Sequence, residues 1–170
     1  MRAAENARTG DENRDPRMKY RQLGKNGPRV SAISMGRGSQ PIEFGDPLEQ
    51  DFNATIARAV ELGINFFDSS DAYWGTRHEV LLGRALKGVR DKVLLSSKFG
   101  NIDLPDGKKA TDGRPEYVFQ SCEASLKRLG VEVIDVYYLH RVDPAVPIEE
   151  TIGAMARLIE QGKVRYLGIC

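Results

Sequence analysis

Residues 63–73, which read GINFFDSSDAY, decide the fold. The apolar side chains in the first half of this stretch predict a short buried strand, and the strand ends on the carboxylate of Asp68. Tyr73 follows five residues later, in the loop that leads into the next predicted helix. The stretch therefore joins a buried strand to two side chains that can take part in acid–base chemistry.

Two later strands end in the same way. Residues 93–97 (VLLSS) are followed by Lys98, and residues 136–139 (VYYL) are followed by His140. Ionisable groups are not tolerated inside a strand that is buried on both faces, so each of them is expected at the carboxyl end of its strand. Active sites of parallel α/β barrels are built at that end. The sequence therefore predicts one rim that carries an aspartate, a tyrosine, a lysine and a histidine.

The composition limits the classes of function that the chain can serve. Its 170 residues indicate one domain, and a hydrophobic content of 41% can supply a core. The net charge of +1 gives no sign of a nucleic-acid or membrane partner. Two cysteines and two histidines argue against a disulfide framework or a metal site. No signal peptide or transmembrane run is visible, so the expected location is the reducing cytoplasm.

The amino-terminal part of the chain divides into a tail and the start of a folded domain. Residues 1–17 are polar without periodicity and are predicted to form a disordered tail, so the domain spans residues 18–170. At residues 24–27 (GKNG), the Asn-Gly pair predicts a β-hairpin. The first strand of the main sheet is then expected at residues 32–35, ending at Gly36.

Helices and strands alternate through the rest of the chain. Helix starts are indicated by Asp46-Pro47, which suits an N-cap followed by proline, and by Thr76 with Glu79, which has the form of a capping box. The Gly-, Asp- and Lys-rich residues 100–114 are expected to form a long loop that is functional or mobile. The later expected elements are helices at 115–130 and 147–162, and strands at 93–97, 133–139 and 164–169.

This alternation, with strand–helix units at roughly 30-residue spacing, predicts a parallel α/β protein. Alternation alone does not separate a doubly wound sheet from a barrel. No Gly-x-Gly-x-x-Gly pattern follows the first strand, which weakens the doubly wound alternative. Ionisable groups at successive strand ends favour a (β/α)8 TIM-type barrel, of which the chain supplies about the first five βα units after its hairpin.

The predicted rim suits proton donation to a carbonyl group that receives hydride. A free tyrosine titrates near pH 10, so its phenol needs help to donate a proton at neutral pH. An ammonium about 4 Å away attracts the phenolate by about 4 kcal/mol at an effective dielectric constant of about 20. Lys98 is therefore expected to make Tyr73 a general acid, with Asp68 as the counter-charge of the lysine. His140 could donate a hydrogen bond that orients the carbonyl oxygen.

Each of these residues also has an alternative interpretation. Asp68 could be a helix N-cap or a loop acceptor, and Tyr73 could be a half-buried packing residue. Lys98 could be a solvated rim charge or a Schiff-base lysine, and His140 could be a buried histidine with satisfied hydrogen bonds. Their predicted convergence from three separate strands favours the functional interpretation.

Several motifs resemble those of one known family, the aldo-keto reductases. The branch that is most similar includes potassium-channel β subunits and related bacterial and plant enzymes. The similarity runs from about Lys19 to Cys170 and covers the first half to two-thirds of such a protein. The motifs that carry it are GINFFDSS at 63–70 with Tyr73, SKFG at 97–100, SLKRL at 125–129, LHR at 139–141 and GKVRYLG at 162–168.

The resemblance implies an (α/β)8 barrel whose amino-terminal hairpin closes its bottom, and NADPH-dependent reduction of aldehydes or ketones. Matched onto this sequence, Tyr73 would be the acid/base, and Lys98 and Asp68 would tune it. His140 would orient the substrate. The cofactor would be NADP(H), and the partner would be a small carbonyl compound.

The resemblance also implies which residues contact the two ligands. Arg37 and Gly38 depart from the usual Thr or Cys and Trp or Met of the family. Cys170 stands where a Ser usually helps to hold the nicotinamide carboxamide. Trp74 stands where Gly is commoner, and is either a wall of the substrate pocket or rim packing. The implied cofactor contacts are Gly36, Arg37, Gly38, Asp68 and Cys170, and the implied substrate contacts are Trp74 and His140.

Two alternative functions remain at the level of sequence. The first is a regulatory subunit that holds NADPH as a channel β subunit does, although such subunits usually carry Asn at the position of His140. The second is an inactive truncated product, because the family's nicotinamide-stacking aromatic, pyrophosphate loop and 2′-phosphate-binding residues lie beyond position 170. On this view, the 170 residues alone are expected to be neither active nor a well-behaved monomer.

Overall fold

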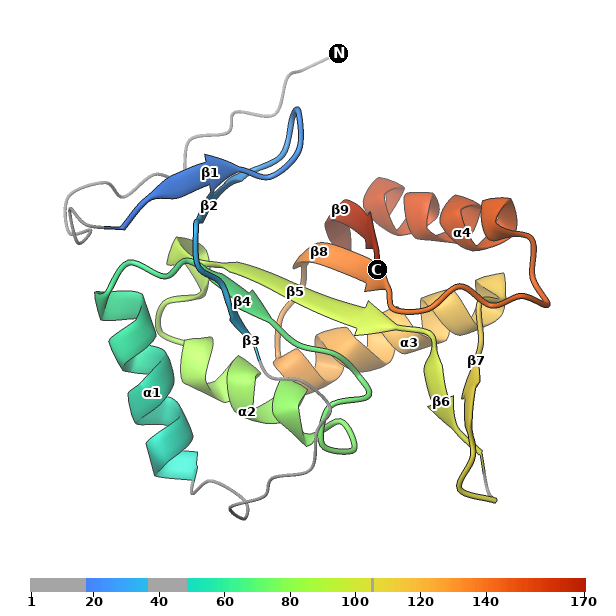
Figure 1. Cartoon of the computed structure of the whole chain (residues 1–170), viewed down its shortest axis with the longest axis horizontal. Coiled ribbons are helices and arrows are strands. Elements are labelled where there is room, and N and C mark those ends of the chain that lie inside the picture. The colour runs from blue at the N-terminus through green and yellow to red at the C-terminus, as the bar shows by residue number, and fades with distance from the viewer. Residues whose placement is uncertain (1–17, 37–48, 105) are drawn as a thin grey trace.

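The computed structural model describes residues 18–36, 49–104 and 106–170 (Figure 1). The predicted tail at residues 1–17 lies outside the described residues, as does the predicted Asp46-Pro47 helix start. Among the helices in the described parts, none is long and apolar enough to cross a membrane.

One parallel sheet of five strands forms the centre of the fold. Its strands are β3 (Met35–Gly36), β4 (Phe66–Asp68), β5 (Leu94–Phe99), β8 (Ile134–Leu139) and β9 (Val164–Ile169). They lie side by side in chain order, and every neighbouring pair is parallel. A doubly wound sheet reverses its strand order at a switch point, whereas here each new strand adds to the same edge. This order confirms the barrel-type topology over the doubly wound alternative.

The helices between the strands pack against one another in sequence. They are α1 (Glu49–Glu61), α2 (Arg77–Leu86), α3 (Pro115–Leu129) and α4 (Ile148–Glu160), with a short 3₁₀ turn η1 (Arg90–Lys92) before β5. Figure 1 shows α1, α2 and α3 along one face of the sheet. Each of these helices contacts the next one along the chain, as barrel helices do.

Successive strand residues face two different cores. On the helix side of the sheet, Phe67, Leu95 and Tyr137 are completely buried in the large core that the strands share with the helices. On the opposite face, Phe66 and Val136 belong to a second, smaller cluster. This second face corresponds to the interior of a barrel, because side chains alternate between the two faces along each strand.

The predicted amino-terminal hairpin is confirmed. Strands β1 (Tyr20–Gln22) and β2 (Arg29–Ser31) pair antiparallel, and Val30 is buried in the smaller cluster of the barrel interior. Ser31 and Asn65 exchange two hydrogen bonds, from the Ser31 N–H to Oδ1 of Asn65 (2.6 Å) and from the Asn65 N–H to Oγ of Ser31 (3.1 Å). The hairpin is thereby fixed to the residue just before β4, at the amino-terminal end of the strands.

The first strand of the main sheet was predicted wrongly at residues 32–35. The structure begins β3 only at the last of these residues. The Ala32 N–H still donates to the Lys19 carbonyl of the hairpin (2.7 Å), and the Ser31 hydroxyl donates to the Ile33 carbonyl (2.7 Å). The chain therefore needs residues 32–34 to bend from the hairpin into the sheet, which leaves a very short β3.

The long loop predicted at residues 100–114 contains a second hairpin. Strands β6 (Asn101–Asp103) and β7 (Lys109–Thr111) pair antiparallel and project beyond the carboxyl end of β5 (Figure 1). Each strand has three residues, most of them polar, so the sequence has no alternation by which to recognise them. The sequence analysis expected a long loop here and did not predict the two strands within it.

The capping box predicted at Thr76 is also absent from the structure. Thr76 has a left-handed backbone (φ 76°) and makes no side-chain hydrogen bond to the start of α2. Glu79 is instead completely buried and accepts hydrogen bonds from Ser97 Oγ (2.5 Å) and Arg128 Nε (2.5 Å). Glu79 therefore ties α2 to β5 and α3, as half of a buried ion pair.

Gly83 allows α2 to approach the end of α3. A Cβ atom at this position would lie 2.1 Å from the carbonyl oxygen of Leu129, which is a backbone atom that cannot rotate away. We expect Gly83→Ala to destabilise the protein by about 1–3 kcal/mol, because the two helices must move apart. Denaturant unfolding of the full-length gene product measures this change.

Gly153 on α4 provides the matched control. It is also a helical glycine, but nothing lies within 4 Å of the Cβ that a substitution would add. Gly153→Ala should therefore be neutral or stabilising by up to about 1 kcal/mol, because alanine favours helix. Equal effects of the two substitutions would show that the close contact between α2 and α3 is not tight in solution.

Candidate active site

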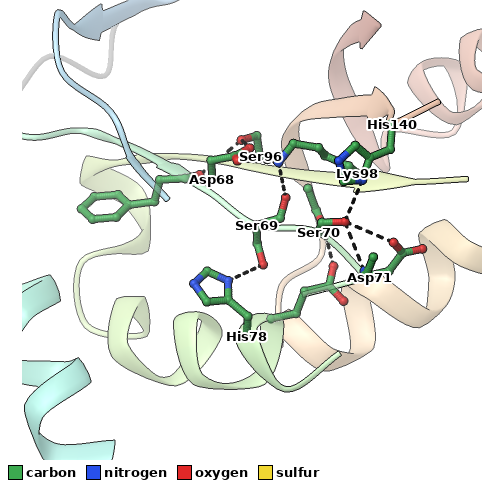
Figure 2. Close-up of polar contacts among 12 residues, drawn as sticks. Asp68, Ser69, Ser70, Asp71, His78, Ser96, Lys98 and His140 are labelled. Carbon is green, nitrogen blue, oxygen red and sulfur yellow. Dashed lines mark hydrogen bonds and ion pairs between the residues drawn. The ribbon is translucent and has the colours of Figure 1, made fainter. Parts of the chain in front are cut away.

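Three ionisable side chains lie at the carboxyl ends of neighbouring strands, on the interior face. Asp68 is the last residue of β4, Lys98 is the penultimate residue of β5, and His140 directly follows β8. Tyr73 lies in the loop between β4 and α2. Figure 2 shows the labelled Asp68, Lys98 and His140 gathered at this rim. The structure thus brings together the four residues that the sequence placed there, while their roles stay predictions.

An ion pair between a buried lysine and a partly buried aspartate forms the base of the site. Lys98 is 7% exposed, and its Nζ donates to Oδ2 of Asp68 and to the carbonyl oxygen of Ser69 (2.8 Å). The other oxygen of Asp68 accepts a hydrogen bond from Ser96 Oγ (2.6 Å). Charge-assisted contacts of this kind hold both groups in one geometry, because neither can leave without exposing an unpaired charge.

The Tyr73 ring lies directly over this pair. The ring is 8% exposed, and Lys98 Nζ lies 4.8 Å from its centroid. Two histidine rings pack against it edge to face, His140 with a centroid distance of 5.9 Å and His78 also at 5.9 Å. Such contacts fix the plane of an aromatic ring, so the tyrosine is held between the lysine and the two imidazoles.

His140 is held from both its backbone and its ring. Its N–H donates to the Phe99 carbonyl (2.8 Å), and its Nδ1 contacts Asn101 Nδ2 (3.0 Å) and Ser70 Oγ (3.2 Å). Burial, followed by the positive charges of Lys98 and Arg141, lowers the pKa of His140. The ring is therefore neutral at pH 7 and can act as a hydrogen-bond donor without carrying a charge.

The sequence analysis missed a polar layer behind these four residues. Ser69, Ser70 and Asp71 directly follow Asp68, and His78 comes from the first turn of α2. Ser69 Oγ contacts His78 Nδ1 at 2.8 Å (Figure 2). The signal available in the sequence was the run of three polar residues immediately after a buried strand.

Asp71 is the carboxylate of this layer, and its pKa is shifted from the ordinary value. It accepts hydrogen bonds from Ser121 Oγ (3.1 Å) and Ser70 Oγ (3.3 Å). Burial raises the pKa of Asp71 to about 6, and the nearby charge of Glu79 adds to the effect, against the opposing influence of these hydrogen bonds and of Arg128. The native protein therefore binds the proton of Asp71 more tightly than the unfolded chain does.

This shift predicts a pH-dependent effect of Asp71→Asn. Between about pH 4 and about pH 6, the unfolded chain gives up this proton while the native protein keeps it, so the carboxyl lowers native stability as the pH rises. The stability of Asp71→Asn relative to wild type should therefore increase by up to about 3 kcal/mol from about pH 4 to about pH 7.5. Denaturant unfolding at the two pH values measures it.

Asp106 gives the contrasting substitution. It lies on the exposed hairpin, where the side chain and backbone of Lys108 lower its pKa. Asp106→Asn should therefore show no gain in relative stability as the pH rises. A gain as large as that of Asp71→Asn would mean that the pH effect is general and does not come from the buried site.

The implied ligand contacts are only partly placed by the structure. Gly36 pairs with Asp68 across β3 and β4, and a Cβ there would lie 3.0 Å from the Asp68 Cβ. Arg37 and Gly38 lie outside the described residues. Cys170 is exposed just beyond β9, and its backbone N–H donates to the carbonyl of Leu139, the last residue of β8 (3.0 Å).

Trp74 packs as part of an aromatic group at the rim. Its ring lies edge to face on His78 at 5.2 Å and on Phe52 of α1 at 6.3 Å. Its backbone is left-handed (φ 52°), which is unusual for a bulky residue. The rim-packing interpretation is therefore observed directly, while a contact with substrate stays a prediction. Across the described ranges, no group of acidic, His or Cys side chains is arranged to hold a metal ion.

The fold and the site together define a class of protein. Parallel strands in chain order, with ionisable side chains at their carboxyl ends, are the arrangement of a (β/α) barrel. Residues 32–170 match the Aldo/keto reductase family, and the chain belongs to this family. The resemblance drawn from the motifs is thereby confirmed, as is the barrel fold class.

Known relatives support the same assignment. "Probable aldo-keto reductase 1" from Glycine max is 46% identical over 152 residues, which are 87% of this chain and 43% of that protein. An aldo-keto reductase from Bacillus halodurans, solved in its holo form, is 35% identical with a TM-score of 0.77 over 89% of this chain and 50% of that one. A thermostable aldo-keto reductase solved with the inhibitor epalrestat is 30% identical, with a TM-score of 0.75 over 89% and 53%. The chain thus spans about half the length of these relatives.

Proposed function

We propose that the chain provides the acid–base site of a reductase that converts aldehyde or ketone carbonyls to alcohols with NADPH. The observation that carries the proposal is the partly buried Asp68–Lys98 pair beneath the Tyr73 ring, with a neutral His140 at its edge. Membership of the Aldo/keto reductase family supports the same chemistry. The site has a proton donor and an orienting group in contact with one another, as reduction of a carbonyl requires.

The residues at the rim fit a nicotinamide ring. Gly36 has no side chain, so Asp68 packs directly against the end of β3, at the part of the rim where the ring would bind. The exposed Cys170 at the end of β9 can offer its thiol to the carboxamide. When bound, the reduced nicotinamide supplies the hydride that attacks the carbonyl carbon.

The chain's own residues handle the proton. As negative charge develops on the carbonyl oxygen, the Tyr73 phenol gives its proton to that oxygen and becomes a phenolate. The Lys98 ammonium stabilises the phenolate, because it lies against the same ring. Asp68 and the Ser69 carbonyl keep the ammonium in place. His140 donates a hydrogen bond that orients the substrate oxygen toward Tyr73.

An assay with the full-length gene product tests the proposal. Purified protein is mixed with NADPH and a panel of aldehydes and ketones, and NADPH oxidation is compared with alcohol formed. We expect the amount of alcohol formed to equal the amount of NADPH oxidised. A parallel assay with NADH compares the two cofactors. Tight binding of NADPH without turnover on any carbonyl would favour the regulatory alternative, and neither binding nor turnover would contradict the proposal.

A further inference from the structure

His140 Nδ1 has two polar neighbours from different parts of the chain. Asn101 is the first residue of β6 and places its Nδ2 at 3.0 Å, and Ser70 from the loop after β4 places its Oγ at 3.2 Å. The second hairpin therefore reaches back to the rim through Asn101. The ring cannot turn over without losing both contacts.

The chemistry of these neighbours decides which ring nitrogen carries the proton. An amide NH₂ group can only donate, so Asn101 requires that His140 Nδ1 be an acceptor. The Ser70 hydroxyl accepts the Ala72 N–H (3.2 Å) and donates its own hydrogen to Asp71 Oδ1 (3.3 Å), so its contact with His140 Nδ1 fits either tautomer. No group at Nδ1 is obliged to accept a hydrogen bond. A neutral ring in this position therefore carries its single proton on Nε2.

The charges around the His140 ring keep it neutral, so only one of its two ring nitrogens carries a proton. The charged groups that face it are Lys98 on β5, the adjacent Arg141, and Asp68 on β4. The two cations disfavour a second proton, and burial acts in the same direction. With one proton available, only the nitrogen that carries it can donate a hydrogen bond to a substrate.

We propose that Asn101 is a positioning residue that fixes His140 in the Nε2–H tautomer, so that the ring donates from Nε2 to the substrate oxygen. The inference rests on the proposed carbonyl reduction for its purpose, but the tautomer itself is a property of the protein alone. It also gives the second hairpin a function, because β6 carries the residue that decides which ring nitrogen of His140 is protonated.

Nitrogen-15 NMR of the imidazole rings tests the tautomer directly in the full-length protein. The signals of His140 are assigned by their loss in His140→Gln. In the wild type, we expect Nδ1 to be unprotonated and Nε2 to carry the proton. Asn101→Asp replaces the donor with a carboxylate of the same shape that can only accept, so the proton should move to Nδ1 and the pKa of His140 should rise.

Gln120→Glu is the matched control for the added charge. Gln120 is exposed on α3 and lines the same groove of about 610 Å³ as Asn101, whereas His140 is not part of that lining. This substitution should leave the proton on Nε2. Ser70→Ala provides a second variant, and it should also keep the Nε2–H tautomer, because Asn101 remains as the donor.

Kinetics separate the positioning role from a purely structural one. Asn101→Asp should lower kcat/KM for the carbonyl by about tenfold or more, the value of one hydrogen bond, while NADPH affinity is unchanged. A wild-type Nδ1–H signal, or an unchanged tautomer in Asn101→Asp, would overturn the inference. A correct tautomer in a wild type that reduces no carbonyl would refute the proposed function and leave the assignment of the tautomer standing.

Discussion

Replacing Tyr73 with phenylalanine is expected to lower kcat by about 10²- to 10⁴-fold, which is the usual contribution of a general acid. The substitution removes one oxygen and keeps the ring that packs on Lys98 and His140. The phenol acts on the alkoxide that develops in the transition state, so the loss belongs to the chemical step. Cofactor affinity should stay within about twofold of wild type.

Single-turnover reduction of an active aldehyde, with NADPH binding measured separately, is the appropriate experiment. Tyr117→Phe serves as the matched control, because Tyr117 is a half-buried tyrosine on α3 that loses the same atom. It should keep near wild-type rates. If Tyr73→Phe reduced the aldehyde as fast as Tyr117→Phe, then Tyr73 could not be the proton donor.

Replacing Arg128 with methionine is expected to destabilise the protein by about 3–5 kcal/mol, which is typical when a buried charge loses its partner. Glu79 is completely buried, and Arg128 is the cation that pairs with it. Methionine keeps much of the packing volume of arginine but leaves the carboxylate with the Ser97 hydroxyl as its remaining side-chain partner among the described residues. The charge of Glu79 then has no adequate compensation inside the protein.

A second substitution should rescue this loss. Adding Glu79→Gln to Arg128→Met removes the stranded charge, so the double variant should recover most of the lost stability in denaturant unfolding. Arg58→Met is the surface control, because the Arg58 and Glu61 side chains are 66% and 64% exposed, and it should cost about 0–1 kcal/mol. If Arg128→Met were no more damaging than Arg58→Met, the buried pair would be unimportant for stability.

The rim of the site could be predicted from sequence because local signals specify it. Asp68, Lys98 and His140 each come at the end of an apolar run, and parallel strands carry such ends to one edge of a sheet. The chain order of the strands then decides between a barrel and a doubly wound sheet. The strand order is a property of the tertiary structure, and the pattern of helices and strands along the sequence does not contain it.

The roles of Glu79 and Asn101 could not be predicted, because they depend on residues far away in the chain. Glu79 with Thr76 matches a capping box locally, and only Ser97 and Arg128 reveal that the carboxylate is buried in an ion pair. Asn101 is equally ordinary in a polar segment. Its contact with His140, 39 residues later, exists only once the hairpin folds back to the rim.

The alternation of side chains along β5 has a consequence for how this site can change during evolution. Lys98 faces the rim, whereas its neighbours Ser97 and Phe99 face α2 and the helix-side core. A deletion of one residue within β5 would therefore shift the alternation by one position. The lysine would then face the hydrophobic helix-side core, and a side chain without acid–base chemistry would face the rim. The strands can accept substitutions but not changes in length. Insertions in the hairpin beyond Asp103 leave the alternation along the strands unchanged. We therefore expect related proteins to change their range of substrates through insertions at that point.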